Sequence, residues 1–249
     1  MVVRLANCQF MIGQFEKVVN FLAKRINKKA NSQMVLPCSL YDLAVKNEQK
    51  HLAFYQNIDY CTSDSMLITN YFRHKYQKKI DRVYGPDLML AIFDYQQKNK
   101  TNLKHYLLCP NNITKKKISA LFNKKYPNQK IFYDYLPKKI SQQQELLHYQ
   151  KILDHKPDFI WIGIGSPKQL AIADWLKNHS QGVKIFCVGA AFDFISGQKK
   201  QAPLWMQKNS LEWLFRLLNE PKRLWKRYLD IIPKYLLGQI LSNKKNNKT

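Results

Sequence analysis

The sequence predicts an α/β fold with a largely parallel sheet. Short apolar runs alternate along the chain with longer runs in which apolar residues recur at helical intervals. This alternation is typical of parallel sheets, in which a helix connects one strand to the next. The clearest element is DFIWIGIG at residues 158–165, a buried strand that ends in a glycine-containing turn. The pattern extends from residue 1 to residue 195.

The expected strands are short apolar runs, each followed by a polar or glycine-containing turn. They lie at residues 2–6, 33–37, 58–64, 104–109, 129–136, 158–165 and 183–192. The expected helices are longer and amphipathic. They lie at residues 15–26, 41–57, 65–76, 115–126, 142–153 and 167–179. Elements in this order predict a Rossmann-like sheet with helices on its faces.

Ligands of such sheets bind beyond the carboxyl ends of the strands. Three features occupy that position: Asp64, the turn GIGSPKQ at residues 163–169, and Gly189. We expect them to converge on one cleft. Backbone N–H groups of the GIGSPKQ turn can bind a phosphate, although a tight strand-to-helix turn also needs glycine for steric reasons.

The pattern changes after Phe194. Residues 1–195 are predicted to form the α/β core, residues 196–240 a small, basic, helical appendage, and residues 241–249 a disordered polar tail. The appendage contains LEWLFRLLNEPKRLWKRYL at residues 211–229, which combines large apolar residues with cations at helical spacing.

The cations Arg216, Arg223 and then Lys226 or Arg227 fall on one face of the expected helices. Three interpretations of this pattern remain open: the solvated face of a packed helix, a helix on a membrane surface, and a set of cations that closes on a diphosphate.

The charge balance indicates an anionic partner. The 249 residues include 41 Lys and Arg against 17 Asp and Glu, a net charge of +24, which suits a nucleic acid, a phosphate-rich ligand or an anionic membrane surface. The five cysteines show no metal-ligand spacing and read as free thiols of a reducing compartment. Neither a signal-peptide layout nor an apolar run of about 18 residues is present, so we expect a cytosolic protein or one on the cytosolic face of a membrane.

Two carboxylates and one arginine are candidates for chemistry. Asp64 can act as a general base or cap the following helix, and the sequence alone favours the cap. Asp87 has the same ambiguity, with a structural role favoured. Arg82 can bind a phosphate or Asp64. The six histidines are scattered, and we predict no metal site.

The motifs WIGIGSPKQ, DRVYGPDLM and the long block from Gly189 to Tyr228 closely resemble the WecG/TagA/CpsF family of glycosyltransferases (glycosyltransferase family 26). The resemblance covers most of the chain. It implies an inverting, metal-independent transfer of a sugar from a UDP-sugar, without a cofactor, to a polyprenol-diphosphate-linked saccharide at the cytoplasmic membrane face. The donors of the family include UDP-N-acetylmannosamine, UDP-N-acetylmannosaminuronic acid and UDP-glucose. The resemblance also implies an α/β core whose C-terminal appendage docks at the membrane and helps to close the active site.

The resemblance assigns roles residue by residue. Asp64 matches the proposed base, Arg82 the arginine before the "GxDL" turn, and Gln169 the glutamine of "PKQ". Appendage cations expected at the UDP diphosphate correspond to Arg216, Arg223 and Lys226, with Arg227 beside the last.

The chain also departs from the family pattern around the pocket expected for the donor. Ser39 stands where asparagine is usual, Ser65 replaces glycine after the base, and Cys109–Pro110 replaces a "GG"-type turn. Leu170 replaces the glutamate of "PKQE". These changes leave the donor sugar open and favour, as an alternative, a catalytically degenerate family member that acts as a scaffold.

A nucleic-acid-binding α/β protein is a further alternative, which the net charge favours. The chain has no RNP, KH or helix-turn-helix signature, so no nucleic-acid partner is expected. The sequence leaves the oligomeric state open, and association through the α/β core would give a homo-oligomer.

Overall fold

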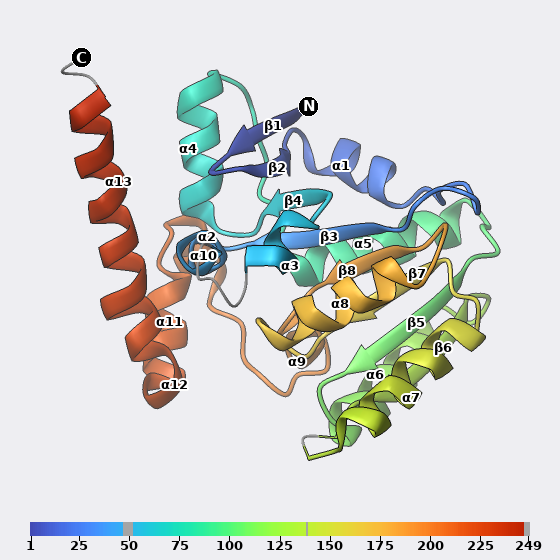
Figure 1. Ribbon diagram of the computed structural model, residues 1–249. Coiled ribbons are helices and arrows are strands. Elements are labelled where there is room, and N and C mark those ends of the chain that lie inside the picture. Colours follow the sequence, from blue (N-terminus) through green and yellow to red (C-terminus); the bar gives the residue numbers. More distant parts are fainter. Residues whose placement is uncertain (47–51, 138, 247–249) are drawn as a thin grey trace.

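The computed structural model describes residues 1–46, 52–137 and 139–246, and side chains only as far as residue 239 (Figure 1). Its eight-stranded sheet has the order β1-β2-β4-β3-β8-β7-β5-β6. All neighbouring strands are parallel except β1 and β2. The strands are β1 (Val2–Leu5), β2 (Cys8–Met11), β3 (Gln33–Cys38), β4 (Tyr60–Ser63), β5 (Lys104–Cys109), β6 (Lys130–Tyr135), β7 (Phe159–Ile162) and β8 (Lys184–Cys187). The predicted α/β fold is confirmed.

Strand β2 is absent from the sequence prediction. It forms an antiparallel hairpin with β1 through Ala6 and Asn7, both of which have positive φ angles (49° and 62°). Two positive φ angles fit the tight turns that join twisted hairpin strands. The usual signal for such a turn is Asn-Gly or Asp-Gly, and Ala-Asn does not provide it.

Helices cover both faces of the sheet. One apolar cluster lies under α2 (Leu40–Val45), α3 (Leu52–Gln56), α4 (Met66–Tyr76), α7 (Gln142–Asp154) and α8 (Lys168–Asn178). The other lies under α1 (Phe15–Leu22), α5 (Gly85–Lys98), α6 (Asn112–Lys125) and α9 (Ala191–Ile195). Strand side chains alternate between the two clusters, as the pleat requires: Ile160 belongs to the first and Trp161 to the second.

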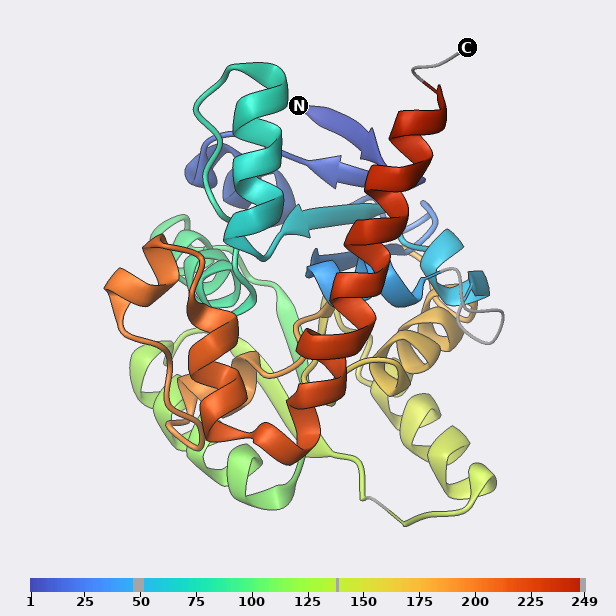
Figure 2. The same cartoon turned by 90° about the vertical axis from the view of Figure 1, so that its left-hand side faces the viewer.

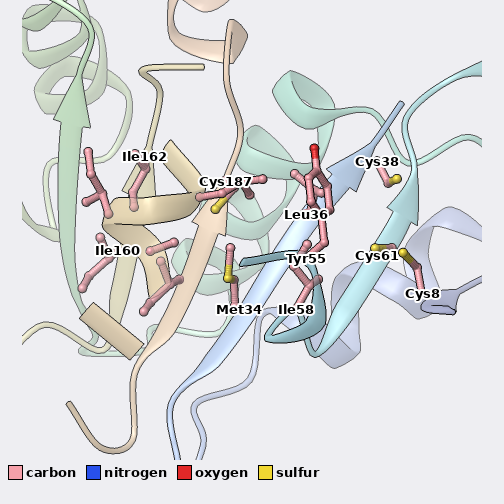
Figure 3. Packing of buried hydrophobic residues seen from close by; sticks show 14 of the residues in the cluster. Cys8, Met34, Leu36, Cys38, Tyr55, Ile58, Cys61, Ile160, Ile162 and Cys187 are labelled. Atoms are coloured by element: carbon pink, nitrogen blue, oxygen red, sulfur yellow. The ribbon is translucent and has the colours of Figure 1, made fainter. Parts of the chain in front are cut away.

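Figure 3 shows part of the first cluster, including Met34 and Leu36 of β3, Cys187 of β8 and Ile160 of β7, in the order of the strands in the sheet. Cys8, Cys38 and Cys61 meet on neighbouring strands in the same cluster. All five cysteines are buried and free, as the scattered spacing predicts.

Several predicted elements differ in extent from the observed ones. The helix expected at residues 15–26 ends at Leu22, and the strand expected at residues 158–165 ends at Ile162. The last strand ends at Cys187 and not at Phe192, because the chain turns at Gly189 (φ +55°) and begins α9. The helix expected at residues 41–57 corresponds to α2 and α3, and residues 47–51 between them lie outside the described part.

The appendage follows α9 and is helical. It contains α10 (Leu204–Lys208), α11 (Glu212–Asn219), α12 (Pro221–Lys226), a π-helical turn η1 (Arg227–Ile231) and α13 (Ile232–Asn246). Figure 2 shows these helices in front of the core, with α13 crossing the region of α2, which it contacts. Helix α13 is continuous to Asn246, past the point where the sequence predicts a disordered tail, and residues 247–249 lie outside the described part. No helix in the described ranges is long and apolar enough to span a membrane.

Candidate active site

A polar pocket of about 180 Å³ lies at the carboxyl ends of the parallel strands. Residues that follow five strands line it: Ser39 after β3, Asp64 after β4, Pro110 after β5, Gly165 after β7 and Gly189 after β8. The predicted convergence of Asp64, the 163–169 turn and Gly189 is therefore confirmed. Appendage cations close the pocket from the other side, and those that line it are Lys199, Arg216, Arg223 and Arg227.

Asp64 is not the cap of the helix that follows it. The N-cap of α4 is Ser65, whose hydroxyl accepts a hydrogen bond from the N–H of Ile68 at 3.3 Å. This arrangement leaves the Asp64 carboxylate free to face the pocket, where its Oδ1 accepts from the N–H of Gly85 at 3.1 Å. The preference of the sequence alone for a capping role is wrong, because the neighbouring serine takes that role.

The environment of Asp64 suits a general base. Burial raises the pKa of its carboxyl to about 6, an increase that Arg82 opposes and the nearby Glu212 reinforces. A carboxylate with this pKa is ionised at neutral pH and accepts a proton more readily than an ordinary aspartate.

Arg82 connects the core to the appendage beside Asp64. Its Nε donates to the backbone carbonyl of Asp64, and its Nη2 donates to Glu212 Oε2 of α11 at 2.7 Å. Both partners of this ion pair are largely buried, with 14% and 15% of their side-chain surface exposed. The guanidinium also lies 4.2 Å from the centroid of the Tyr84 ring. Arg82 thus links the end of β4, where Asp64 lies, to α11.

Gln169 ties together the two loops on the opposite side of the pocket. Its Oε1 accepts from the N–H of Gly189 at 3.0 Å and of Gly165 at 3.3 Å, and its Nε2 donates to Ser166 Oγ at 3.1 Å. The Gly165 N–H considered above for phosphate binding is therefore used internally. A Cβ at Gly163 would overlap the Phe192 ring, so this position has room only for glycine.

The appendage arginines differ in how their charges are satisfied. Arg223 is exposed and pairs with Glu220 at 2.5 Å. Arg216 and Arg227 are partly buried, and the buried Nε of each has no hydrogen-bond partner in the described part of the chain. The Nη2 of Arg227 donates to Ser39 Oγ at 2.9 Å, and its guanidinium lies 4.4 Å from the Tyr41 ring centroid.

Lys226 is exposed and lines neither this pocket nor the one described below, whereas the adjacent Arg227 lines both. Neighbouring residues of a helix point in directions about 100° apart, so only one of the two can face the site. The turn η1, which begins at Arg227, sets which one does. The helical spacing allowed either residue, and in the structure Arg227 lines the pocket while Lys226 does not.

The departures from the family pattern have clear local roles. Ser39 caps α2 and donates to Asp42 Oδ2 at 2.6 Å while accepting from Arg227. Pro110 lines the pocket, and Cys109 and Leu170 are fully buried in the apolar clusters. These residues thus take capping, pocket-lining and core positions in the fold.

A second pocket, of about 450 Å³, adjoins the first and is mostly apolar. Its walls come from the starts of α2 and α4 and from α11, η1 and α13. The two pockets share five lining residues, all polar or charged: Ser39, Tyr41, Asp64, Arg216 and Arg227. Asp64 therefore stands where a polar and an apolar cavity meet.

Two features of the site have no sequence signal. Glu212 reads as a solvated acid at the start of an amphipathic helix, and Tyr41 as an ordinary helix residue, yet they contact Arg82 and Arg227 respectively. Within the described ranges no group of three or more His, Cys, Asp or Glu residues is placed to hold a metal ion.

A carboxylate at the junction of two pockets, with guanidinium groups around it, suits a group-transfer reaction, and comparison with known proteins makes the class a glycosyltransferase. The model of the WecG/TagA/CpsF glycosyl transferase family matches residues 3–249. The chain belongs to this family.

Two similar proteins are both called N-acetylglucosaminyldiphosphoundecaprenol N-acetyl-beta-D-mannosaminyltransferase. The Bacillus subtilis (strain 168) protein is 31% identical over 168 residues, which span 68% of this chain and 62% of the Bacillus protein. The Staphylococcus aureus (strain MW2) protein is 24% identical over 243 residues, which span 96% of this chain and 90% of that protein.

Proposed function

We propose that the protein transfers a sugar from a UDP-sugar to a saccharide linked to polyprenol diphosphate, in the synthesis of a cell-surface polymer. The observation that carries the proposal is Asp64, a base of raised pKa at the junction of a polar and an apolar pocket. The names of the two relatives support N-acetylglucosaminyl-diphospho-undecaprenol as acceptor and N-acetylmannosamine as the first donor sugar to test.

In this mechanism the UDP-sugar lies in the polar pocket and the acceptor enters from the apolar side. Asp64 removes a proton from the acceptor hydroxyl as that oxygen attacks the anomeric carbon. The bond from that carbon to the UDP oxygen breaks, and the configuration inverts. The transition state resembles an oxocarbenium ion, as in other glycosyl chemistry.

The leaving UDP gains negative charge on its diphosphate, and cations must stabilise it. Arg216 and Arg227 line the polar pocket and each has a buried N–H group without a partner in the described chain. Charge-assisted hydrogen bonds from these guanidinium groups to phosphate oxygens would give the N–H groups a partner and stabilise the charge of the diphosphate. Arg223, already paired with Glu220, would contribute less.

The appendage would also hold the protein at the cytoplasmic face of the membrane. From residue 198 to residue 249 it carries 12 Lys and Arg against three acids, and each cation near an anionic leaflet contributes about 1 kcal/mol. It also exposes large apolar side chains, which suit the lipid interface. These are Leu204, Trp205, Leu218, Trp225, Leu229, Leu236 and Leu237.

The test is release of UDP from a panel of UDP-sugars, with and without a short-chain polyprenol-diphosphate-GlcNAc acceptor. The proposal expects acceptor-dependent release from one donor, and loss of it in Asp64→Asn. Folded protein that releases UDP from no donor would contradict the proposal and favour a scaffolding role.

A further inference from the structure

The apolar pocket is larger and less polar than a saccharide needs. Its volume of about 450 Å³ falls in the range of small-molecule sites. Apolar side chains from both parts of the molecule form its walls, among them Met66 and Leu67 of α4, Trp213 of α11 and Ile232 of α13. A sugar offers hydroxyl groups at every face, and such walls would leave them without hydrogen bonds.

The two ends of this pocket have opposite character. Where it adjoins the polar pocket lie the charged groups of Asp64, Arg216 and Arg227, and Arg82 and Glu212 also line it, so the lining has three cations against two carboxylates. Its other lining includes Leu67, Leu229 and Leu236, which are exposed by 47%, 61% and 40%. A ligand that matches this gradient has an anionic head and a hydrocarbon tail that leaves the pocket between these leucines.

The charged end also has unsatisfied hydrogen-bonding capacity. The Nε atoms of Arg216 and Arg227 are buried and without a hydrogen-bond partner in the described part of the chain. These residues line both pockets, so their guanidinium groups lie where the two cavities adjoin. The apolar pocket thus has anion-binding groups where it adjoins the polar pocket.

We propose that this pocket binds the isoprenoid segment next to the diphosphate of the acceptor, so that the enzyme recognises the lipid and not only the sugar. The proposal deepens the proposed function and rests on it for the identity of the acceptor. It assigns a binding role to Leu229 of η1 and to Leu67 and Leu236 beside it. The lipid tail would leave the pocket toward the membrane-facing side chains of the appendage.

The test measures binding of prenyl diphosphates to the full chain by calorimetry, below their micellar concentrations and without membranes or donor. The probes are inorganic diphosphate and the C5, C10 and C15 prenyl diphosphates. Each methylene group removed from water strengthens binding about fourfold, so we expect the C15 compound to bind at least about tenfold more tightly than the C5 compound.

Variants of two exposed appendage leucines separate the pocket from the general apolar surface. Leu229 and Leu237 are similarly exposed, at 61% and 60%, but only Leu229 lines the pocket. We expect Leu229→Gln to weaken binding of the C15 compound about tenfold and of the C5 compound less than about twofold, and Leu237→Gln to change neither.

Binding that does not depend on chain length in the wild type would overturn the inference, and so would equal losses in the two variants. The proposed function fails separately, because binding of prenyl diphosphates needs no transfer. Chain-length-dependent binding in a protein that glycosylates no acceptor would support the lipid site and contradict the transferase.

Discussion

The core and the appendage contribute to the same pocket in different ways. Two polar side chains of the core pocket form hydrogen bonds within the protein. The amide of Gln169 uses its oxygen and its nitrogen to join two loops, and the carboxylate of Asp64 accepts from the N–H of Gly85. The appendage guanidiniums of Arg216 and Arg227 each keep a buried N–H group without a partner in the described chain. Since buried polar groups are nearly always hydrogen-bonded, the comparison supports the proposal that an anion binds on the appendage side of the pocket.

The largest expected effect comes from the core side of this comparison. Asp64→Asn removes the base but keeps a side-chain oxygen that can accept from Gly85, so the fold should persist. We expect kcat to fall by about 10²–10⁴-fold, measured as UDP release. Asp87→Asn is the matched control, because Asp87 is exposed in the first turn of α5 and lines neither pocket. Similar losses of kcat in both variants would contradict the role of Asp64 as general base.

The appendage side is tested by two adjacent cations. Arg227→Ala removes a guanidinium that lines both pockets, and we expect kcat to fall by about 10²-fold, as for other groups that stabilise transition-state charge. Lys226→Ala should change kcat less than about twofold with a membrane-free acceptor, because Lys226 is exposed and outside the pockets. If Lys226→Ala were the more damaging change, the position carried over from the family would be the right one.

The ion pair between the two parts offers a smaller effect. Glu212 raises the pKa of Asp64 and holds Arg82. Because Asp64 must be ionised to act as base, kcat/KM of the wild type should fall as the pH drops through about 6. Glu212→Gln removes a neighbouring negative charge, so this acid limb should move to lower pH. If the variant were less active but its kcat/KM fell at the same acid pH as that of the wild type, Glu212 would only support the fold.

The smallest effect is on stability. The pKa of Asp64 is higher in the folded protein than in the unfolded chain, so its contribution is favourable at acid pH and is lost as the pH rises through about 6. At pH 7.5 Asp64→Asn should therefore be the more stable protein, by about 1 kcal/mol after allowance for partial exposure, or about 2–4 °C in Tm. The difference should shrink toward pH 4. A lower Tm at pH 7.5 would show that the carboxylate stabilises the fold.

The sequence predicted most of the sheet and the place of the pocket, because apolar periodicity reports burial directly. It missed β2, whose turn has an unusual composition. It could not decide whether Asp64 is a general base or a helix cap, and in the structure Ser65 caps α4. It also could not choose between Lys226 and Arg227, since helical spacing admits both. Such choices depend on contacts between distant segments, such as Arg82 with Glu212, which no local pattern contains.

The account depends most on the proposal that the appendage arginines Arg216 and Arg227, which line the polar pocket, bind the diphosphate of UDP. The direct measurement is the affinity of the full chain for UDP and for uridine, in the wild type and in Arg216→Ala. We predict that the variant binds UDP at least about tenfold more weakly, a loss of about 1.4 kcal/mol, and uridine as the wild type does. Equal losses for the two ligands, or no loss of UDP affinity, would contradict the account.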